Sequence, residues 1–120
     1  ILTVSGIENS ELVFYYNVAD VLLMTSFHEG SPNVIKEAMA CNCPIVSTRV
    51  GDVEWVLGET TVCYLADFDA VDFAKKIESA LKYAEDKGRT NGRERIIELG
   101  LDSESVAKQI VEIYHQVLRN

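Results

Sequence analysis

The sequence predicts an α/β fold built on a mostly parallel sheet, and two features of its apolar pattern lead to this prediction. Residues 19–25 are almost continuously apolar, which is typical of a parallel strand covered on both faces. Short strand-like runs also alternate along the chain with segments of helical periodicity, and this order requires right-handed crossovers between parallel strands. The 120 residues are enough for one small domain.

The first half of the chain is expected to contain three of four strands. Residues 1–5 would form a strand that ends at Gly6, followed by a helix that begins at Asn9 or Ser10 and runs to about residue 17. Residues 19–25 would form the second strand.

The second helix is expected to begin at Ser31 and Pro32. The Ser31 hydroxyl would cap this helix, and proline suits the first helical position because the N–H there has no intrahelical partner. The helix would run to about Cys41, and residues 44–47 would form the third strand.

The second half of the chain is predicted to be mainly helical. Residues 53–57 would form a short helix and residues 61–65 the fourth strand. Asp69 would then cap a long helix that ends at Gly88, and a further helix would cover residues 90–99.

The last helix is expected to begin at Asp102, with Leu101 and Val106 forming a hydrophobic staple. Its apolar residues form one stripe: Val106, Ile110, Ile113 and Val117. Two interpretations of the stripe remain open. It packs on its own domain, or, together with Tyr114 and Leu118, it forms a docking surface.

Composition excludes several classes of function. The net charge of −8 argues against nucleic-acid binding, because phosphate contacts need clustered Lys and Arg. No apolar run approaches the roughly 20 residues of a membrane helix, and the first residues lack the basic region of a signal peptide. Cys41, Cys43 and Cys63 do not have a metal-binding or redox spacing, which favours small apolar roles in a reducing, cytoplasmic setting.

The loop between the second strand and the second helix is the best candidate for a ligand site. Such loops hold anionic ligands in α/β proteins, where the helix N-terminus presents free N–H groups. Gly30 would let the backbone approach a ligand closely. The N–H groups of Asn33 and Val34, aided by the helix dipole, would bind phosphate.

Two carboxylates flank this loop and suit the hydroxyls of a sugar or ribose. Glu37 lies about one and a half turns into the helix, within reach of a ribose, whereas Glu29 precedes the helix and faces another part of the ligand. Either acid taken alone would be interpreted as a solvated surface residue. The pair becomes specific through the Gly-Ser-Pro turn between the acids and the buried strand before them. His28 is either a catalytic base or a packing residue.

Residues 20–57 resemble the retaining glycosyltransferases of family 4, the group 1 glycosyltransferases. The shared signature is Glu29 and Glu37 separated by seven residues, then Ala-Met-Ala, a small turn, a Pro-Ile-Val strand and a Gly-containing loop. The variant Glu-Gly-Ser-Pro-Asn-Val is similar to that of enzymes of capsule, O-antigen and exopolysaccharide assembly.

This resemblance implies the GT-B architecture, in which two Rossmann-like domains face each other across a cleft. The C-terminal domain binds a nucleotide-diphosphate sugar donor, and the N-terminal domain binds a glycan or lipid-linked acceptor. The chain would be the later part of the donor-binding domain, a Rossmann-like parallel sheet with flanking helices. We therefore expect residues 1–120 to be a fragment that is inactive alone, because the upstream part of this domain and the acceptor domain are absent.

The resemblance also assigns residues. Glu29 would be the catalytic contact to the donor sugar, and Glu37 would bind the ribose hydroxyls. The donor-binding turn would comprise Gly30, Ser31, Asn33 and Val34, and the base would lie near Gly6 and Ile7. Transfer would retain the anomeric configuration and would need no metal or other cofactor.

Two departures from the family pattern stand out. Many members have Gly-Phe-Gly where this chain has Gly30-Ser31-Pro32, and Pro32 offers no N–H. Many members have Asp where Arg49 stands. Arg49 is either a surface exchange or a group that assists an anionic ligand.

Two rival interpretations remain. The chain could be a nonenzymatic α/β module that binds a nucleotide or a protein partner, or part of a GT-B sugar-nucleotide epimerase. For the intact enzyme, the resemblance is compatible with a cytoplasmic protein that associates with membranes through upstream basic segments.

Overall fold

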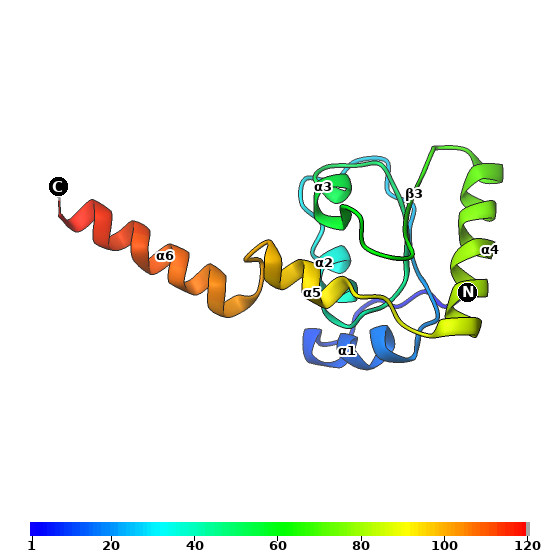
Figure 1. Ribbon diagram of the computed structural model, residues 1–120, viewed down its shortest axis with the longest axis horizontal. Helices are drawn as coiled ribbons and strands as arrows, with labels where there is room; N and C mark the ends of the chain where they lie inside the picture. Colours follow the sequence, from blue (N-terminus) through cyan, green and yellow to red (C-terminus); the bar gives the residue numbers. More distant parts are fainter. Residues whose placement is uncertain (120) are drawn as a thin grey trace.

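The computed structural model describes residues 1–119, which fold into a three-layer α/β arrangement of helices on both faces of one sheet (Figure 1). The elements follow in the order α1 (Asn9–Val18), β1 (Leu22–Met24), α2 (Asn33–Ala40), β2 (Ile45–Thr48), α3 (Val53–Leu57), β3 (Cys63–Ala66), α4 (Ala70–Lys87), α5 (Gly92–Glu98) and α6 (Ser103–Leu118).

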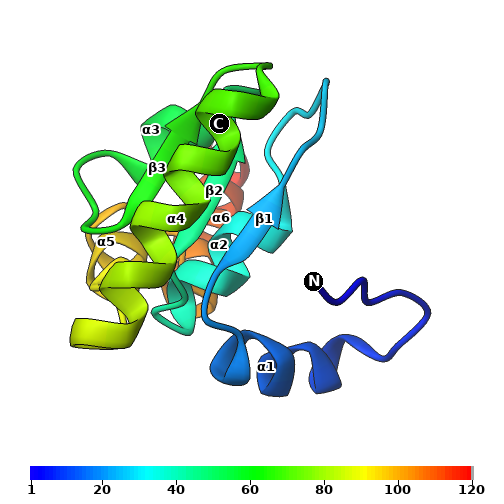
Figure 2. The same ribbon diagram turned by 90° about the vertical axis from the view of Figure 1, so that its right-hand side faces the viewer.

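The sheet is parallel, with the strand order β1-β2-β3. Helix α4 covers one face, and α2, α3 and α5 lie on the other (Figures 1 and 2). Successive residues of β2 enter opposite cores: Ile45 packs with Ile35 and Met39, whereas Val46 packs with Ala80. Burial on both faces explains the near-continuous apolar strands, so the predicted α/β fold with flanking helices is confirmed.

The predicted strand at residues 1–5 is absent, which leaves three strands among the described residues instead of four. Ile1 and Leu2 are largely exposed. An extended segment becomes a strand only when a neighbour supplies hydrogen bonds and a core covers one face. Within residues 1–119 this segment has neither.

The second helix begins one residue later than expected. Pro32 is the N-cap residue, with an extended backbone (φ −68°, ψ 123°), and Asn33 is the first helical residue. The expectation that Ser31 caps the helix is wrong, because its hydroxyl is engaged elsewhere, as described below.

The predicted caps of the two long helices are confirmed. The Asp69 carboxylate accepts a hydrogen bond from the Asp72 amide at 2.8 Å, and α4 ends at Gly88. The Asp102 carboxylate accepts one from the Ser105 amide at 3.0 Å and starts α6. In both cases a short acceptor satisfies an amide that has no intrahelical partner.

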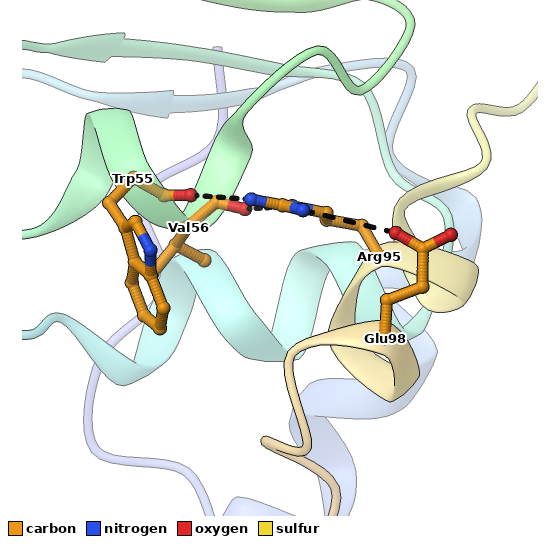
Figure 3. A network of polar contacts seen from close by, with 4 residues as sticks. All are labelled: Trp55, Val56, Arg95 and Glu98. Carbon is orange, nitrogen blue, oxygen red and sulfur yellow. Dashed lines mark hydrogen bonds and ion pairs between the residues drawn. The ribbon is translucent and has the colours of Figure 1, made fainter.

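An arginine joins α5 to the end of α3 (Figure 3). The Arg95 guanidinium donates to the carbonyls of Trp55 at 3.0 Å and Val56 at 3.4 Å, and its other nitrogen lies 3.8 Å from the Glu98 carboxylate. The last carbonyls of a helix lack intrahelical donors, so this cation satisfies them and fixes α5 against α3.

Helix α6 projects away from the body of the domain (Figure 1). None of its residues is buried, and the stripe that includes Ile110 and Ile113 is exposed. The stripe therefore does not pack on the rest of residues 1–119. Over the same described range, no helix has both the length and the apolarity to cross a membrane.

Candidate functional site

The three parallel strands end at one edge of the sheet, where the loops after β1, β2 and β3 come together (Figure 2). This carboxyl edge is where open α/β sheets bind ligands. The β1–α2 loop carries Glu29, Gly30 and Ser31, and the β2–α3 loop carries Gly51 and Asp52.

Glu29 is held by two hydroxyl residues that sequence reasoning missed. The Ser26 hydroxyl donates to the Glu29 carboxylate at 2.8 Å. The hydroxyl of Thr48, which is 3% exposed, donates to the Ser26 carbonyl at 2.6 Å. This relay runs from the end of β2 to the β1–α2 loop. It orients one carboxylate oxygen of Glu29, and the other oxygen has no hydrogen-bond partner within the described residues.

The β2–α3 loop supports the turn at Gly30 and Ser31. The Asp52 amide donates to the Gly30 carbonyl at 2.9 Å, and the Ser31 hydroxyl donates to the Asp52 carboxylate at 2.5 Å. The Lys36 ammonium donates in turn to the Ser31 hydroxyl at 2.6 Å. A Cβ at Gly30 would meet nothing within 4 Å, so there is room for a ligand beside this backbone.

The start of α2 offers two free donors. Asn33 and Val34 are its first two helical residues, and within residues 1–119 no acceptor bonds to either amide. Both residues are exposed. This is the local geometry that the prediction of an anion site requires, although their binding of a donor remains a prediction.

Glu37 faces α1. Its carboxylate accepts a hydrogen bond from the Tyr16 hydroxyl at 2.8 Å. Tyr16 is buried, and burial together with the neighbouring Glu37 carboxylate raises the pKa of Tyr16 well above its ordinary value. The phenol therefore stays protonated and acts as a donor to Glu37 throughout the neutral range.

The two acids lie on one loop–helix unit but have different supports. Glu29 is held from β2 through Ser26, and Glu37 is held from α1. No hydrogen bond joins the two carboxylates in the described chain. Gly6 and Ile7 lie in the irregular segment before α1, outside the three loops of the carboxyl edge. Their proposed position near the base stays a prediction.

Arg49 forms an ion pair with Glu54 at the start of α3, and both side chains are more than half exposed. This contact favours the surface-exchange interpretation over assistance to a ligand.

A stacked aromatic pair also lies at the carboxyl edge. The rings of Phe27, in the β1–α2 loop, and Phe68, in the β3–α4 loop, are 5.4 Å apart between centroids and nearly parallel. The two residues are 85% and 56% exposed. No periodicity in the sequence indicates this pair, because its members come from loops 41 positions apart (68 − 27).

All three cysteines are free thiols. Burial is the main cause that raises the pKa of Cys63 to about 12, and it also raises the pKa of Cys43. Within residues 1–119, no group of three or more His, Cys, Asp or Glu side chains is arranged to hold a metal ion.

A comparison with solved structures relates this geometry to a known architecture. Sucrose-phosphate synthase from Thermosynechococcus elongatus superposes with a TM-score of 0.87 at 29% identity, over 97% of this chain and 30% of that one. The three-stranded parallel sheet and its helices thus match part of a GT-B glycosyltransferase.

The family model "Glycosyl transferases group 1" matches residues 3–83. This chain therefore belongs to the group 1 glycosyltransferases, as its Glu-x7-Glu signature predicts.

Curated relatives agree with this assignment. N-acetyl-alpha-D-glucosaminyl L-malate synthase of Bacillus anthracis is 34% identical over 107 residues, which is 86% of this chain and 28% of that protein. MMP alpha-(1->4)-mannosyltransferase of Mycolicibacterium hassiacum is 30% identical over 97% of this chain and 29% of its own length. The lipopolysaccharide core biosynthesis glycosyltransferase LpsE of Rhizobium meliloti is 38% identical over 63% of this chain and 22% of that protein. The chain thus spans less than a third of the length of these relatives.

Proposed function

We propose that residues 1–120 contribute the donor-binding part of a retaining glycosyltransferase. The enzyme would transfer a sugar from a nucleotide-diphosphate sugar to a glycan or lipid-linked acceptor. The observation that carries this proposal is the β1–α2 unit, which combines an oriented Glu29 carboxylate with the unpaired amides of Asn33 and Val34. A sugar diphosphate presents hydroxyls and anionic oxygens, the two kinds of group that these residues bind.

Each part of the unit has a role in the proposed reaction. The α2 amides and the helix dipole stabilise the negative charge of the diphosphate. Glu29 orients the donor sugar and favours positive charge at the anomeric carbon, and Glu37 anchors the ribose. The acceptor hydroxyl attacks from the face that the diphosphate leaves. Catalysis then depends on positioning and electrostatics, with no covalent intermediate on the protein.

The chain alone is proposed to be inactive. Two cations lie near the β1–α2 and β2–α3 loops, and both are engaged: Lys36 bonds Ser31, and Arg49 pairs with Glu54. A departing diphosphate needs cationic stabilisation, and we assign this to the remainder of the full-length protein, as we do the binding of the acceptor.

We extend the proposal to a role in polysaccharide assembly. Two relatives bear names from such pathways: the lipopolysaccharide core enzyme of Rhizobium meliloti and a putative teichuronic acid biosynthesis glycosyltransferase of Bacillus subtilis. Other relatives are named for small acceptors, including D-inositol 3-phosphate. We therefore propose the glycan or lipid-linked acceptor as a class and assign the reaction to the cytoplasm, where nucleotide sugars and reduced thiols occur together.

The test is an assay of the full-length protein with labelled nucleotide-diphosphate sugars, with and without oligosaccharide and lipid-linked acceptors. Label that moves to an acceptor with the donor's anomeric configuration is the expected result. An inverted product would contradict retention. Release of a free epimerised sugar would favour the epimerase, and donor binding without turnover would favour a nonenzymatic module.

A further inference from the structure

The hydrogen bond between Tyr16 and Glu37, which are 21 residues apart in sequence, joins α1 to α2. The Tyr16 hydroxyl lies 2.8 Å from Oε2 of Glu37, whereas Oε1 has no hydrogen-bond partner within residues 1–119. One oxygen of the carboxylate is therefore fixed by the protein, and the other is left to accept a hydrogen bond from a ligand hydroxyl.

The position of Tyr16 is itself fixed relative to α2. The guanidinium of Arg89 donates to the Tyr16 carbonyl at 2.5 Å and the Ala19 carbonyl at 2.7 Å, at the end of α1. It also donates to the carbonyl of Cys41, the residue that ends α2, at 3.0 Å. One planar cation thus connects the ends of both helices, so the phenol is presented to Glu37 from a rigid support.

A tyrosine that served only to fill space would not need its hydroxyl. The Tyr16 ring belongs to the apolar core that includes Ile35 and Met39, and phenylalanine would occupy the same volume. The hydroxyl adds a donor aimed at a carboxylate. Because this hydrogen bond already restricts the rotamers of Glu37, less side-chain entropy is lost when a ligand binds.

We propose that Tyr16 is a positioning residue that holds the Glu37 carboxylate in the orientation needed to bind the ribose hydroxyls of the donor. This inference rests on the proposed function of Glu37 and extends it to α1. Tyr16 touches no substrate; it acts through Glu37, and Arg89 keeps the two helices in register.

The test compares two adjacent tyrosines in the full-length protein. Tyr16→Phe removes the hydroxyl that bonds Glu37. Tyr15→Phe is the matched control, because Tyr15 is on the same helix, is partly exposed, and has no side-chain hydrogen bond within the described residues. We expect Tyr16→Phe to raise the donor KM about five- to tenfold, with kcat changed less than twofold. Tyr15→Phe should leave both parameters unchanged.

A double-variant cycle shows whether the effect passes through Glu37. If it does, Tyr16→Phe combined with Glu37→Ala should have the same donor KM as Glu37→Ala alone, because nothing is left for the phenol to orient. An additional rise in KM in the double variant would overturn the proposal, since Tyr16 would then act through another group.

The outcomes also separate this proposal from the proposed function of Glu37. An unchanged donor KM in Tyr16→Phe overturns the positioning role, whatever Glu37→Ala does. An unchanged KM in Glu37→Ala rejects ribose binding by Glu37 and the positioning role with it. A lower thermal midpoint for Tyr16→Phe with unchanged kinetics assigns the hydroxyl to stability alone, which also contradicts the proposal.

Discussion

A Cβ at Gly51 would lie 2.0 Å from the carbonyl oxygen of Gly30. The β2–α3 loop therefore lies directly against the β1–α2 loop, at a distance that only glycine permits. The Asp52 amide, the next donor along the chain, bonds the same Gly30 carbonyl at 2.9 Å. The position of the Gly30–Ser31 turn is thus set by a neighbouring loop as well as by its own sequence.

Gly51→Ala is predicted to displace the Gly30 turn. Gly51 has φ +52°, so alanine there carries a left-handed strain of roughly 1–2 kcal/mol in addition to the clash with Gly30. Gly88→Ala is the control, because Gly88 has φ +83° but nothing within 4 Å of a Cβ. Transferase activity of the full-length protein should fall about a hundredfold for Gly51→Ala, in line with an ångström-scale misplacement, and little for Gly88→Ala. Equal losses in the two variants would contradict the role of this close approach.

Ser26→Ala should reduce turnover, because it removes the donor that orients Glu29. We expect kcat to fall about tenfold with little change in donor KM, and Glu29→Ala to lower kcat further. Ser79→Ala is the control, since Ser79 is exposed on α4 and within residues 1–119 its hydroxyl bonds only the Lys75 carbonyl. If donor affinity alone changes in Ser26→Ala, Glu29 acts in ground-state binding and its transition-state role is wrong.

Arg89→Ala should destabilise the protein. It removes the guanidinium that donates to the carbonyls of Tyr16, Ala19 and Cys41 and leaves the Ala19 carbonyl only its weak contact with the Cys43 thiol. We expect the free energy of unfolding to fall by roughly 3 kcal/mol, the upper end for a hydrogen bond to a charged group. Denaturant titration measures this change. Arg93→Ala is the matched control, because Arg93 is exposed and bonds Asn42 through its backbone amide. Similar midpoints for the two variants would show that the three carbonyls find other partners.

Alkaline pH should destabilise the fold through Cys63. Its pKa is raised from 9.0 to about 12 by burial, so the unfolded chain loses this proton at lower pH than the folded chain does. The stabilising contribution of the neutral thiol is complete below pH 9 and is lost as the pH rises from 9 toward 12, by up to about 1.4 kcal/mol per pH unit. Denaturant titrations at pH 8 and pH 10.5 should show a smaller decline for Cys63→Ala than for the wild type. An equal decline would assign the pH dependence to other groups.

The α/β class, the carboxyl-edge loop and the acidic pair could be predicted from the sequence because each depends on local pattern. The Asp69 and Asp102 caps were confirmed for the same reason, since a cap needs only the residues next to it. The prediction of a strand at residues 1–5 was wrong, because a strand depends on a neighbouring strand that the local sequence pattern does not reveal.

The supports of the site could not be predicted because they join residues distant in sequence. The Thr48 hydroxyl, at the end of β2, bonds the Ser26 carbonyl in the loop after β1. The Tyr16 hydroxyl on α1 bonds Glu37 on α2. Ser31 was expected to cap α2, but a tertiary partner, Asp52, competes successfully for its hydroxyl. The local preference failed because the Ser31 hydroxyl, which as a cap would accept a hydrogen bond from a nearby amide, instead donates one to a distant carboxylate.

Donor binding by Glu37 is tested most directly by the affinity of the full-length protein for its nucleotide-diphosphate sugar, measured by isothermal titration calorimetry for the wild type and for Glu37→Ala. Glu78→Ala, an exposed change on α4, is the control. We predict that Glu37→Ala raises Kd at least about tenfold, equivalent to about 1.4 kcal/mol, while Glu78→Ala binds as the wild type does. A Kd for Glu37→Ala equal to that of the wild type would contradict the claim that Glu37 binds the ribose of the donor.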